Sequence, residues 1–405
     1  MSASITENSK SRDQWTDNEF LDSLRQKGDY LADACFEELK EVLEEENFGN
    51  LFKTLKANDQ PLSSNMPEPL RQFIERTTTL PLIGGETIDF DRIRRGQRVF
   101  MTQAFPSALV LLTKALPSGY AAPNLSRILC LSDNLSKRPY RRLLGVLQMV
   151  VNVCAVGGFE KNGKAIITIP KMRLLHAGIR HITRRHLPDY QNDFGVPVNQ
   201  EDMLGSVMGF SYLVINGLRQ LDIGLTTIQA EDLYYLWRVF AQMMGIHPEN
   251  DPNSSMFVPA NLYEAKVFYD SYSQRHYVDA VNNPDGVQLA KANLQMLNDL
   301  LPQTPLRQLG LKIVPRVYME QLMGRKGCAR IGIQPVRFLF VSKWVLKKLP
   351  GVWSRLWNVT DRFDPSRHYH ENLSRIFFQG LINREFNGEI TFRIPDTLEE
   401  LRKLA

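Results

Sequence analysis

The sequence predicts an all-α fold, and three observations lead to this class. Apolar residues recur at helical spacing in several long runs, such as 140–156 and 172–186. Helix-breaking residues stand at the ends of the first run, with Pro139 before it and Gly157 after it. Only one interval, 161–169, alternates as a strand does, and it is too short to define a sheet. At 405 residues the chain can bury a large core, as one large domain or two ordinary ones.

The expected elements follow in order along the chain. Residues 1–17 are polar and predict a disordered tail, and 60–69, rich in Pro, Ser and Asn, predict a linker. Helical segments are predicted at 18–45 (one acidic amphipathic helix or a pair), 89–116, 140–156, 172–186 and 199–219.

The last of these segments begins with a capping signal. Asn199 can cap the helix, and Asp202 three residues later imitates the second residue of a capping box. Gly205 and Gly209 lie four residues apart on it. They would allow close approach either of another helix or of a flat cofactor, and the spacing does not decide between the two.

The segment 172–186 carries the residues with the clearest chemistry. On a helix of 100° per residue with His176 at zero, Arg180 falls near +40°, Arg173 near +60° and Arg184 near +80°. A separate apolar stripe between about −40° and −120° consists of Met172, Leu175, Ile179 and Ile182. An imidazole flanked by guanidinium groups suits haem, because iron binds the neutral ring nitrogen and arginines bind propionates. A packed histidine beside a solvated basic face is the alternative.

The other histidines of this segment do not form a metal site with His176. His181 and His186 lie about 140° and 280° around the helix from it, so the three cannot share one ion from one face.

Two ordered motifs carry a family resemblance. The run 171–181 (KMRLLHAGIRH), followed by 195–205 (GVPVNQEDMLG), resembles the core signature of the rubber-oxygenase family, which includes the latex-clearing proteins and the fungal oxygenase MpaB. The segments 118–124, 141–142 and 233–246 fit the same pattern, so the resemblance covers roughly residues 85–260. It implies a globin-like helical core that binds haem b. His176 would be the axial ligand of the iron, with Arg173 and Arg180 close to the cofactor.

The sequence departs from the rubber-cleaving members on the other side of the expected haem. Those enzymes carry a glutamate and a nearby lysine-threonine pair before the haem helix, whereas no glutamate occurs here between Gln103 and Phe159. Asn124, Leu143 and Leu144 occupy the corresponding region and are the distal candidates, with Val151 on the wall. The distal pocket of a haem protein decides between oxygen binding and oxygen activation. We therefore expect this chain to share the haem of the family rather than its rubber substrate.

Composition excludes several other classes. A net charge of +5 with 23% charged residues does not indicate nucleic-acid binding. No CxxC or CxxCH pair is present, which excludes the spacing of c-type haem, zinc ribbons and iron–sulfur clusters. The four cysteines, scattered along the chain, indicate a reducing compartment: Cys35, Cys130, Cys154 and Cys328. Residues 1–13 contain no apolar segment of a secretory signal, so we expect a cytoplasmic protein.

A basic, tryptophan-rich interval, 334–357, stands apart from the rest. It contains three of the five tryptophans and five Lys or Arg residues without any acid. This composition is typical of a segment at a membrane surface, and a core helix with a basic edge is the alternative. No apolar run elsewhere reaches the length of a bilayer span.

We therefore expect a haem b-dependent oxygenase. It would cleave a carbon–carbon double bond of an isoprenoid or other lipid-like intracellular substrate with dioxygen. Two alternatives are a non-catalytic haem-binding sensor or carrier and a cofactor-free helical lipid-binding protein. The predicted organisation is a tail (1–17), an N-terminal helical extension (18–84), the haem-binding oxygenase core (85–320) and a C-terminal helical extension packed on the core (321–405).

Overall fold

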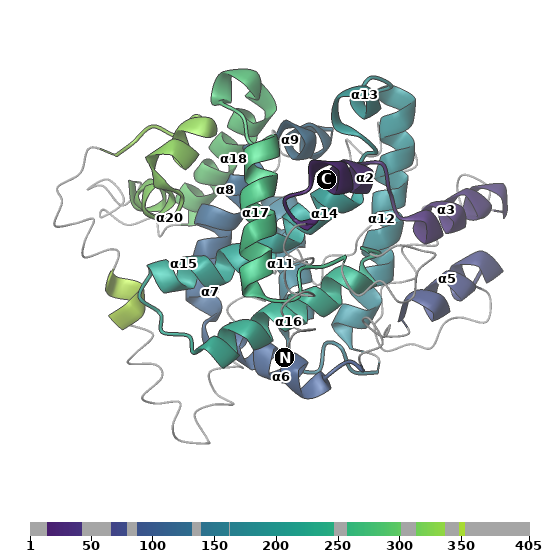
Figure 1. Cartoon of the computed structure of the whole chain (residues 1–405), viewed down its shortest axis with the longest axis horizontal. Helices are drawn as coiled ribbons and strands as arrows, with labels where there is room; N and C mark the ends of the chain where they lie inside the picture. Colours follow the sequence, from purple (N-terminus) through teal and green to yellow (C-terminus); the bar gives the residue numbers. More distant parts are fainter. Residues whose placement is uncertain are drawn as a thin grey trace.

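Helices make up all the regular structure that can be described. The computed structural model describes residues 14–42, 66–78, 87–131, 139–161, 163–246, 257–300, 313–336 and 348–352. Within these ranges no strand occurs, which confirms the predicted all-α class (Figure 1).

In the N-terminal part the described residues include the helices α2 (Asn18–Arg25), α3 (Tyr30–Val42) and α5 (Glu68–Thr78). The acidic segment predicted at 18–45 is thus a pair of helices rather than one. The predicted tail is wrong for its last residues, because Trp15 is fully buried and its indole Nε1 donates to Glu264 Oε2 at 3.1 Å. An aromatic anchor of this kind orders the chain next to it. Residues 1–13 and 60–65 lie outside the described residues.

The predicted helical run 89–116 is broken. It consists of α6 (Phe90–Thr102), α7 (Ala104–Val110), the π-helical turn η1 (Leu111–Ala115) and α8 (Leu116–Gly119). The axis of α6 is bent by 82° from that of the following run, with Gln103 between them. Next come α9 (Pro123–Cys130) and α11 (Pro139–Cys154), which confirms the helix predicted at 140–156.

The predicted strand at 161–169 is wrong. Residues 164–169 form the first turns of α12 (Lys164–His186), which continues through Pro170. Its buried residues there, Ala165, Thr168 and Ile169, follow helical spacing, and Thr168 accepts a hydrogen bond from Asn152 Nδ2 of α11 at 2.9 Å. Packing against α11 therefore outweighs the local β-propensity of the isoleucines.

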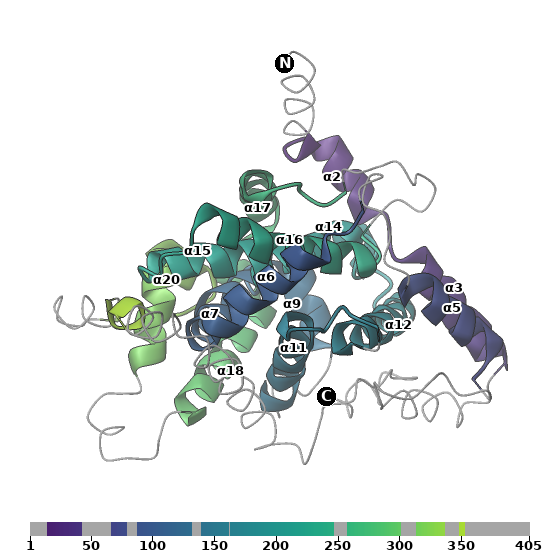
Figure 2. The same ribbon diagram turned by 90° about the horizontal axis from the view of Figure 1, so that it is seen from below.

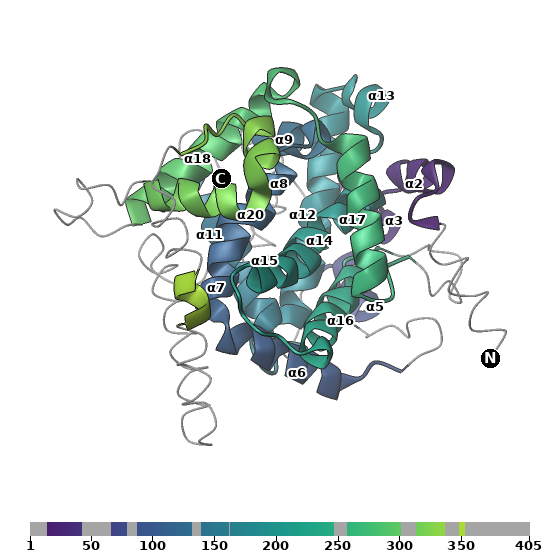
Figure 3. The ribbon, with the colours of Figure 1, turned by 60° about the vertical axis from the view of Figure 1, so that its left-hand side comes forward.

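The C-terminal half of the chain continues with further helices (Figure 3). They are α13 (Tyr190–Phe194), α14 (Gln200–Met208), the π-helical turn η2 (Gly209–Leu213), α15 (Val214–Gln220), α16 (Thr227–Met243), α17 (Leu262–His276), the short 3-10 turn η3 (Ala280–Asn282), α18 (Pro284–Leu300) and α20 (Val314–Arg330). The predicted cap is confirmed, because Asn199 Oδ1 accepts from the backbone N–H of Asp202 at 2.8 Å.

Three apolar clusters hold the described helices together, and one of them joins α18 and α20 to the segment around Tyr120. The main core joins α2, α6, α7, α11, α14, α15, α16 and α17. A smaller cluster joins α3 and α5 to one side of α12, through Leu174 and Ala177. Figure 2 shows α3 and α5 side by side at the edge of the molecule, next to α12. The helix that carries His176 is therefore packed between the main core and a peripheral helix pair.

The crossing of α6 and α16 yields a test of the packing. A Cβ added to Gly96 would lie 2.4 Å from the backbone oxygen of Asp232. We expect Gly96→Ala to lower the free energy of unfolding by about 1–3 kcal/mol, because backbone atoms cannot move aside as a flexible side chain can. Urea unfolding measures this. Gly224→Ala, where a Cβ would meet no described atom within 4 Å, is the control and should stay within about 0.5 kcal/mol.

The described part of the chain contains no single helix that is long and apolar enough to cross a bilayer. Phe90–Gly119 meets the criteria of length and composition only as a pair of helices bent by 82°. Most of the basic interval 334–357 lies outside the described residues, and its described Lys348 forms an ion pair with Asp222. The membrane-surface role of this interval stays a prediction.

Candidate functional site

Helix α12 presents His176 at mid-length. Its side chain is half-buried, and the ring atom Nδ1 is buried. Leu174 and Ala177 on the same helix face the α3–α5 cluster, and Met172 packs against the main core. A histidine imidazole held in this way could serve as the protein ligand of haem iron.

Arg173, three residues before His176, binds Asp29 of the N-terminal segment. Its Nε and Nη2 donate to the two carboxylate oxygens of Asp29 at 2.6 and 2.7 Å, and Nη1 donates to the backbone oxygen of Met243 at 3.1 Å. Both side chains of the pair are 4% exposed. Burial alone would raise the pKa of Asp29, but Arg173 outweighs it and holds that pKa below its ordinary value.

Arg180, four residues after His176, is also occupied. Its Nε and Nη2 both lie 2.7 Å from Asp33 Oδ1, and Nη1 donates to the backbone oxygen of Val198 at 3.4 Å. The Arg180 side chain is fully buried, whereas that of Asp33 is 26% exposed. Burial raises the pKa of Asp33 despite the opposing effect of Arg180.

These contacts bear on the predicted haem site. No three His, Cys, Asp or Glu side chains of the described residues converge as a protein-only metal site requires. Haem needs a single protein ligand, since its porphyrin supplies the other nitrogens, and His176 fits that requirement. The two arginines do not fit propionates as they stand, because each already binds a carboxylate of the chain. Their propionate role stays a prediction.

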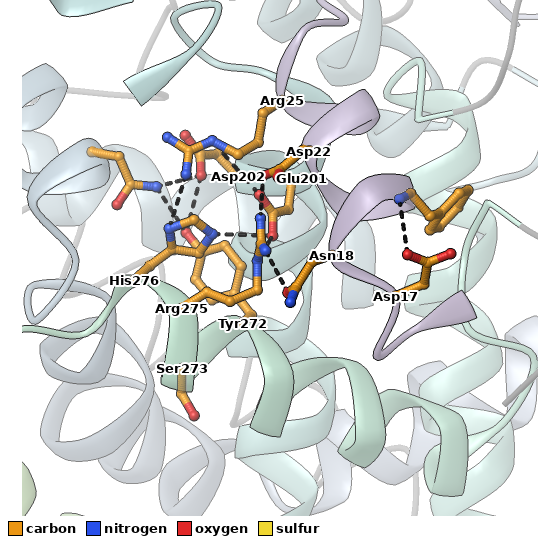
Figure 4. Close-up of polar contacts among 12 residues, drawn as sticks. Asp17, Asn18, Asp22, Arg25, Glu201, Asp202, Tyr272, Ser273, Arg275 and His276 are labelled. Carbon is orange, nitrogen blue, oxygen red and sulfur yellow. Dashed lines mark hydrogen bonds and ion pairs between the residues drawn. The ribbon is translucent and has the colours of Figure 1, made fainter. Parts of the chain in front are cut away.

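A second polar cluster lies where α2, α14 and α17 meet (Figure 4). Arg25, Arg275 and His276 point toward the adjacent acids Glu201 and Asp202. Glu201 is fully buried, and its Oε1 lies 3.1 Å from Arg275 Nε and 3.0 Å from His276 Nε2. Arg25 Nε lies 3.9 Å from the other oxygen, which is an ion pair without a direct hydrogen bond. This cluster joins the N-terminal helix to the helices that follow the cap at Asn199.

Asn124, a distal candidate from the sequence, belongs to this cluster. It is buried at the start of α9, and its Nδ2 donates to Asp202 Oδ1 and to Tyr272 Oη. Tyr272 also packs its ring against Gly205, where an added Cβ would lie 2.7 Å from it. Of the two alternatives for Gly205, close approach by another helix is the one observed there. Asn124 thus links helices to one another, and its distal role stays a prediction.

The remaining distal candidates are less defined. Leu143 and Leu144 lie on α11, but their side chains are outside the described residues. Val151, on the same helix, is buried within the main core. The assignment of these residues to the distal side of the expected haem therefore stays a prediction.

Comparisons with known proteins cover this part of the chain. The sequence model of the family described as "ER-bound oxygenase mpaB/B'/Rubber oxygenase, catalytic domain" matches residues 93–335, well over half of the chain. The chain belongs to this family. The resemblance seen in the motifs around His176 and Asp202 is thereby confirmed.

Two known proteins are similar to this member of the oxygenase catalytic-domain family. The rubber oxygenase of Streptomyces sp. (strain K30) is 26% identical over 255 residues, which are 62% of this chain but only 58% of that protein. A structure of latex clearing protein LCP in the closed state superposes with a TM-score of 0.67 and 19% identity, covering 92% of this chain and 95% of the other. The second similarity confirms the fold.

The family match covers only some of the residues in these ion pairs. His176, Arg173, Arg180, Glu201 and Asp202 fall within 93–335, whereas their partners Arg25, Asp29 and Asp33 lie outside it. The charge cluster at Glu201 was not predicted from the sequence. The one available signal was the pair of acids directly after the cap, Glu201-Asp202, which would be costly to bury without cations.

The buried carboxyl of Asp202 makes the stability depend on pH. Burial raises its pKa from 3.8 to about 6, against the opposing effect of His276. The folded state holds this proton more tightly than the unfolded chain does. The stabilisation that Asp202 contributes to the folded state is therefore fully present below about pH 4 and is lost as pH rises through 6. The loss is at most about 3 kcal/mol, since one pKa unit corresponds to about 1.4 kcal/mol.

We therefore expect Asp202→Asn to become more stable relative to the wild type as pH rises from 4 to 7. Urea unfolding of both proteins across this range measures the difference between their unfolding free energies. A difference that stays constant with pH would show that Asp202 titrates in the folded protein as it does in the unfolded chain.

Proposed function

We propose that this protein is a haem b-dependent oxygenase that cleaves a carbon–carbon double bond of an isoprenoid or other lipid-like molecule. The observation that carries the proposal is the position of His176 within the matched oxygenase catalytic domain. It is a half-buried imidazole on a helix packed from two sides. The haem, the substrate class and the predicted cytoplasmic location belong to the proposal.

The overall reaction balances without an external reductant. One olefin and one dioxygen molecule become two carbonyl compounds, so the double bond breaks, two C=O bonds form and both oxygen atoms are incorporated. Haem, when bound, supplies the binding and activation of dioxygen.

The chain's own residues provide the setting. His176 would hold the cofactor through one ring nitrogen. The ion pairs of Arg173 and Arg180, three residues before and four after it, hold α12 in place. Apolar side chains of the neighbouring core, including Met172, would exclude water and suit a hydrocarbon substrate.

The first experiment is the visible spectrum of protein expressed with ample haem precursor, oxidised and reduced, with a pyridine haemochrome assay. We expect a Soret band and about one haem b per chain, as a single axial histidine predicts. A protein that stays colourless, and that does not acquire a Soret band on titration with haemin, would rule out the haem oxygenase.

Oxygen consumption then separates the enzyme from a haem carrier. With squalene in detergent as an olefin, an oxygenase consumes dioxygen and yields carbonyl products, whereas a sensor or carrier binds carbon monoxide without turnover. The saturated analogue squalane is the matched control and should give no consumption. Equal rates with both would contradict cleavage of a double bond.

A further inference from the structure

The two arginines that flank His176 are anchored from outside the matched catalytic domain. Arg173 binds Asp29 through two hydrogen bonds, and Arg180 binds Asp33. Asp29 and Asp33 lie at the start of α3, whereas the family match begins at residue 93. Charged groups that are buried to this degree persist only when they are paired, so each arginine depends on its acid.

The segment that carries these acids is itself held firmly. Leu21 and Leu24 of α2 belong to the main core, and Trp15 donates to Glu264. Between α2 and α3, the backbone oxygens of Arg25 and Lys27 accept hydrogen bonds from the N–H groups of Val196 and Gln200, at 2.9 Å each. The position of Asp29 is therefore set by the core of the molecule and not by α3 alone.

The ion pair of Asp29 and Arg173 lies close against the backbone at Gly245. Gly245 adopts a φ of +85°, and a Cβ there would lie 2.8 Å from Asp29 Oδ2 and 3.0 Å from Arg173 Nη2. Near the second pair, a Cβ on Gly28 would lie 3.2 Å from Arg180 Cδ. Close approach of this kind fixes the guanidinium groups against their acids.

The spacing along α12 gives these contacts a role toward His176. The two anchors lie three residues before and four residues after the histidine, about one helical turn on each side. Contacts on both sides resist rotation of the helix about its axis and sliding along it. An axial ligand must hold its direction within about 10–20°, so rotation of α12 would misdirect the imidazole.

We propose that Asp29 and Asp33 are positioning residues for His176, and that they act through Arg173 and Arg180. The arginines then serve as anchors of α12 rather than as ligands of cofactor propionates, and residues 14–33 belong to the functional unit. This inference rests on the proposed haem site for its effect on the cofactor, while the positioning of α12 can be measured without it.

The test compares Asp29→Asn with the wild type in two measurements. In the haem-free protein, NMR of labelled histidine follows the ring signals of His176, and hydrogen exchange follows the amides of α12. In the loaded protein, haem affinity and the iron–histidine stretching band report the ligand geometry. We expect a changed His176 signal, faster exchange in α12 and haem affinity lowered about 10–100-fold, as for other groups that orient a metal ligand.

Two further variants sharpen the comparison. Glu37→Gln removes another carboxylate of α3, an exposed one that bonds to His181 of α12, and should leave every measurement within about twofold. Asp33→Asn alters the second pair, whose acid is 26% exposed, and replaces Asp29→Asn if that variant fails to fold. It should change the same signals in the same direction.

The outcomes separate the inference from the proposed function. Changed His176 signals in a protein that never binds haem would support positioning and overturn the haem oxygenase. Loss of haem affinity in Arg180→Gln without any loss in Asp33→Asn would show that the arginine binds the cofactor, which overturns the inference. Unchanged His176 signals and α12 exchange in both acid variants would overturn it as well.

Discussion

The His176→Ala variant should lose its Soret band and bind haem at least about 100-fold more weakly than the wild type. An axial ligand contributes more than the groups that orient it, whose removal already costs about 10–100-fold in metal affinity. His176 is half-buried on α12, and no other described side chains converge as a metal site. Titration of the haem-free protein with haemin, followed in the Soret region, measures the affinity.

His181→Ala is the matched control for this prediction. His181 lies on the same helix, but its side chain is 28% exposed and its ring Nδ1 is 3.0 Å from Glu37 Oε1. Exposed pairs of this kind contribute little, so haem affinity should stay within about twofold. Added imidazole should restore a Soret band to His176→Gly, because a free ligand can enter the space of the lost ring. If His176→Ala retains the wild-type spectrum and affinity, the ligand assignment is wrong.

Glu201→Gln should lower the free energy of unfolding by about 3–5 kcal/mol. The side chain is fully buried and faces Arg275, His276 and the more distant Arg25. Glutamine keeps the shape but removes the negative charge, which leaves the partly buried guanidinium groups of Arg25 and Arg275 without the buried carboxylate that they share. Urea unfolding at neutral pH measures the loss, and hydrogen exchange should locate faster opening at α2, which the cluster holds against α14 and α17.

Asp22→Asn provides the control on the same arginine. Asp22 Oδ1 lies 2.6 Å from Arg275 Nη2, but its side chain is 64% exposed, so water screens the pair. The expected loss is below about 1 kcal/mol. Equal losses of unfolding free energy in the two variants would mean that burial does not make the ion pairs of Glu201 more stabilising than an exposed pair.

Parts of this protein could be predicted from local sequence, because their causes are local. Helical periodicity indicated α11 and the part of α12 that carries His176. The cap at Asn199 could be predicted because its hydrogen bond spans only three residues. The order of motifs around His176 indicated the family, which the match over 93–335 confirms. The strand predicted at 161–169 failed where local propensity opposed packing, because Thr168 pairs with Asn152 of α11.

The partners of the charged residues were decided by tertiary structure alone. Helical spacing alone shows that Arg173 and Arg180 lie on the same side of α12 as His176, because a helix repeats every 3.6 residues. It could not show that they bind Asp29 and Asp33, nearly 150 residues earlier in the chain. Likewise, Glu201 meets Arg25 and Arg275 only because α2 and α17 fold onto α14. A buried charge requires a partner, but only the packing of distant helices decides which residue becomes that partner.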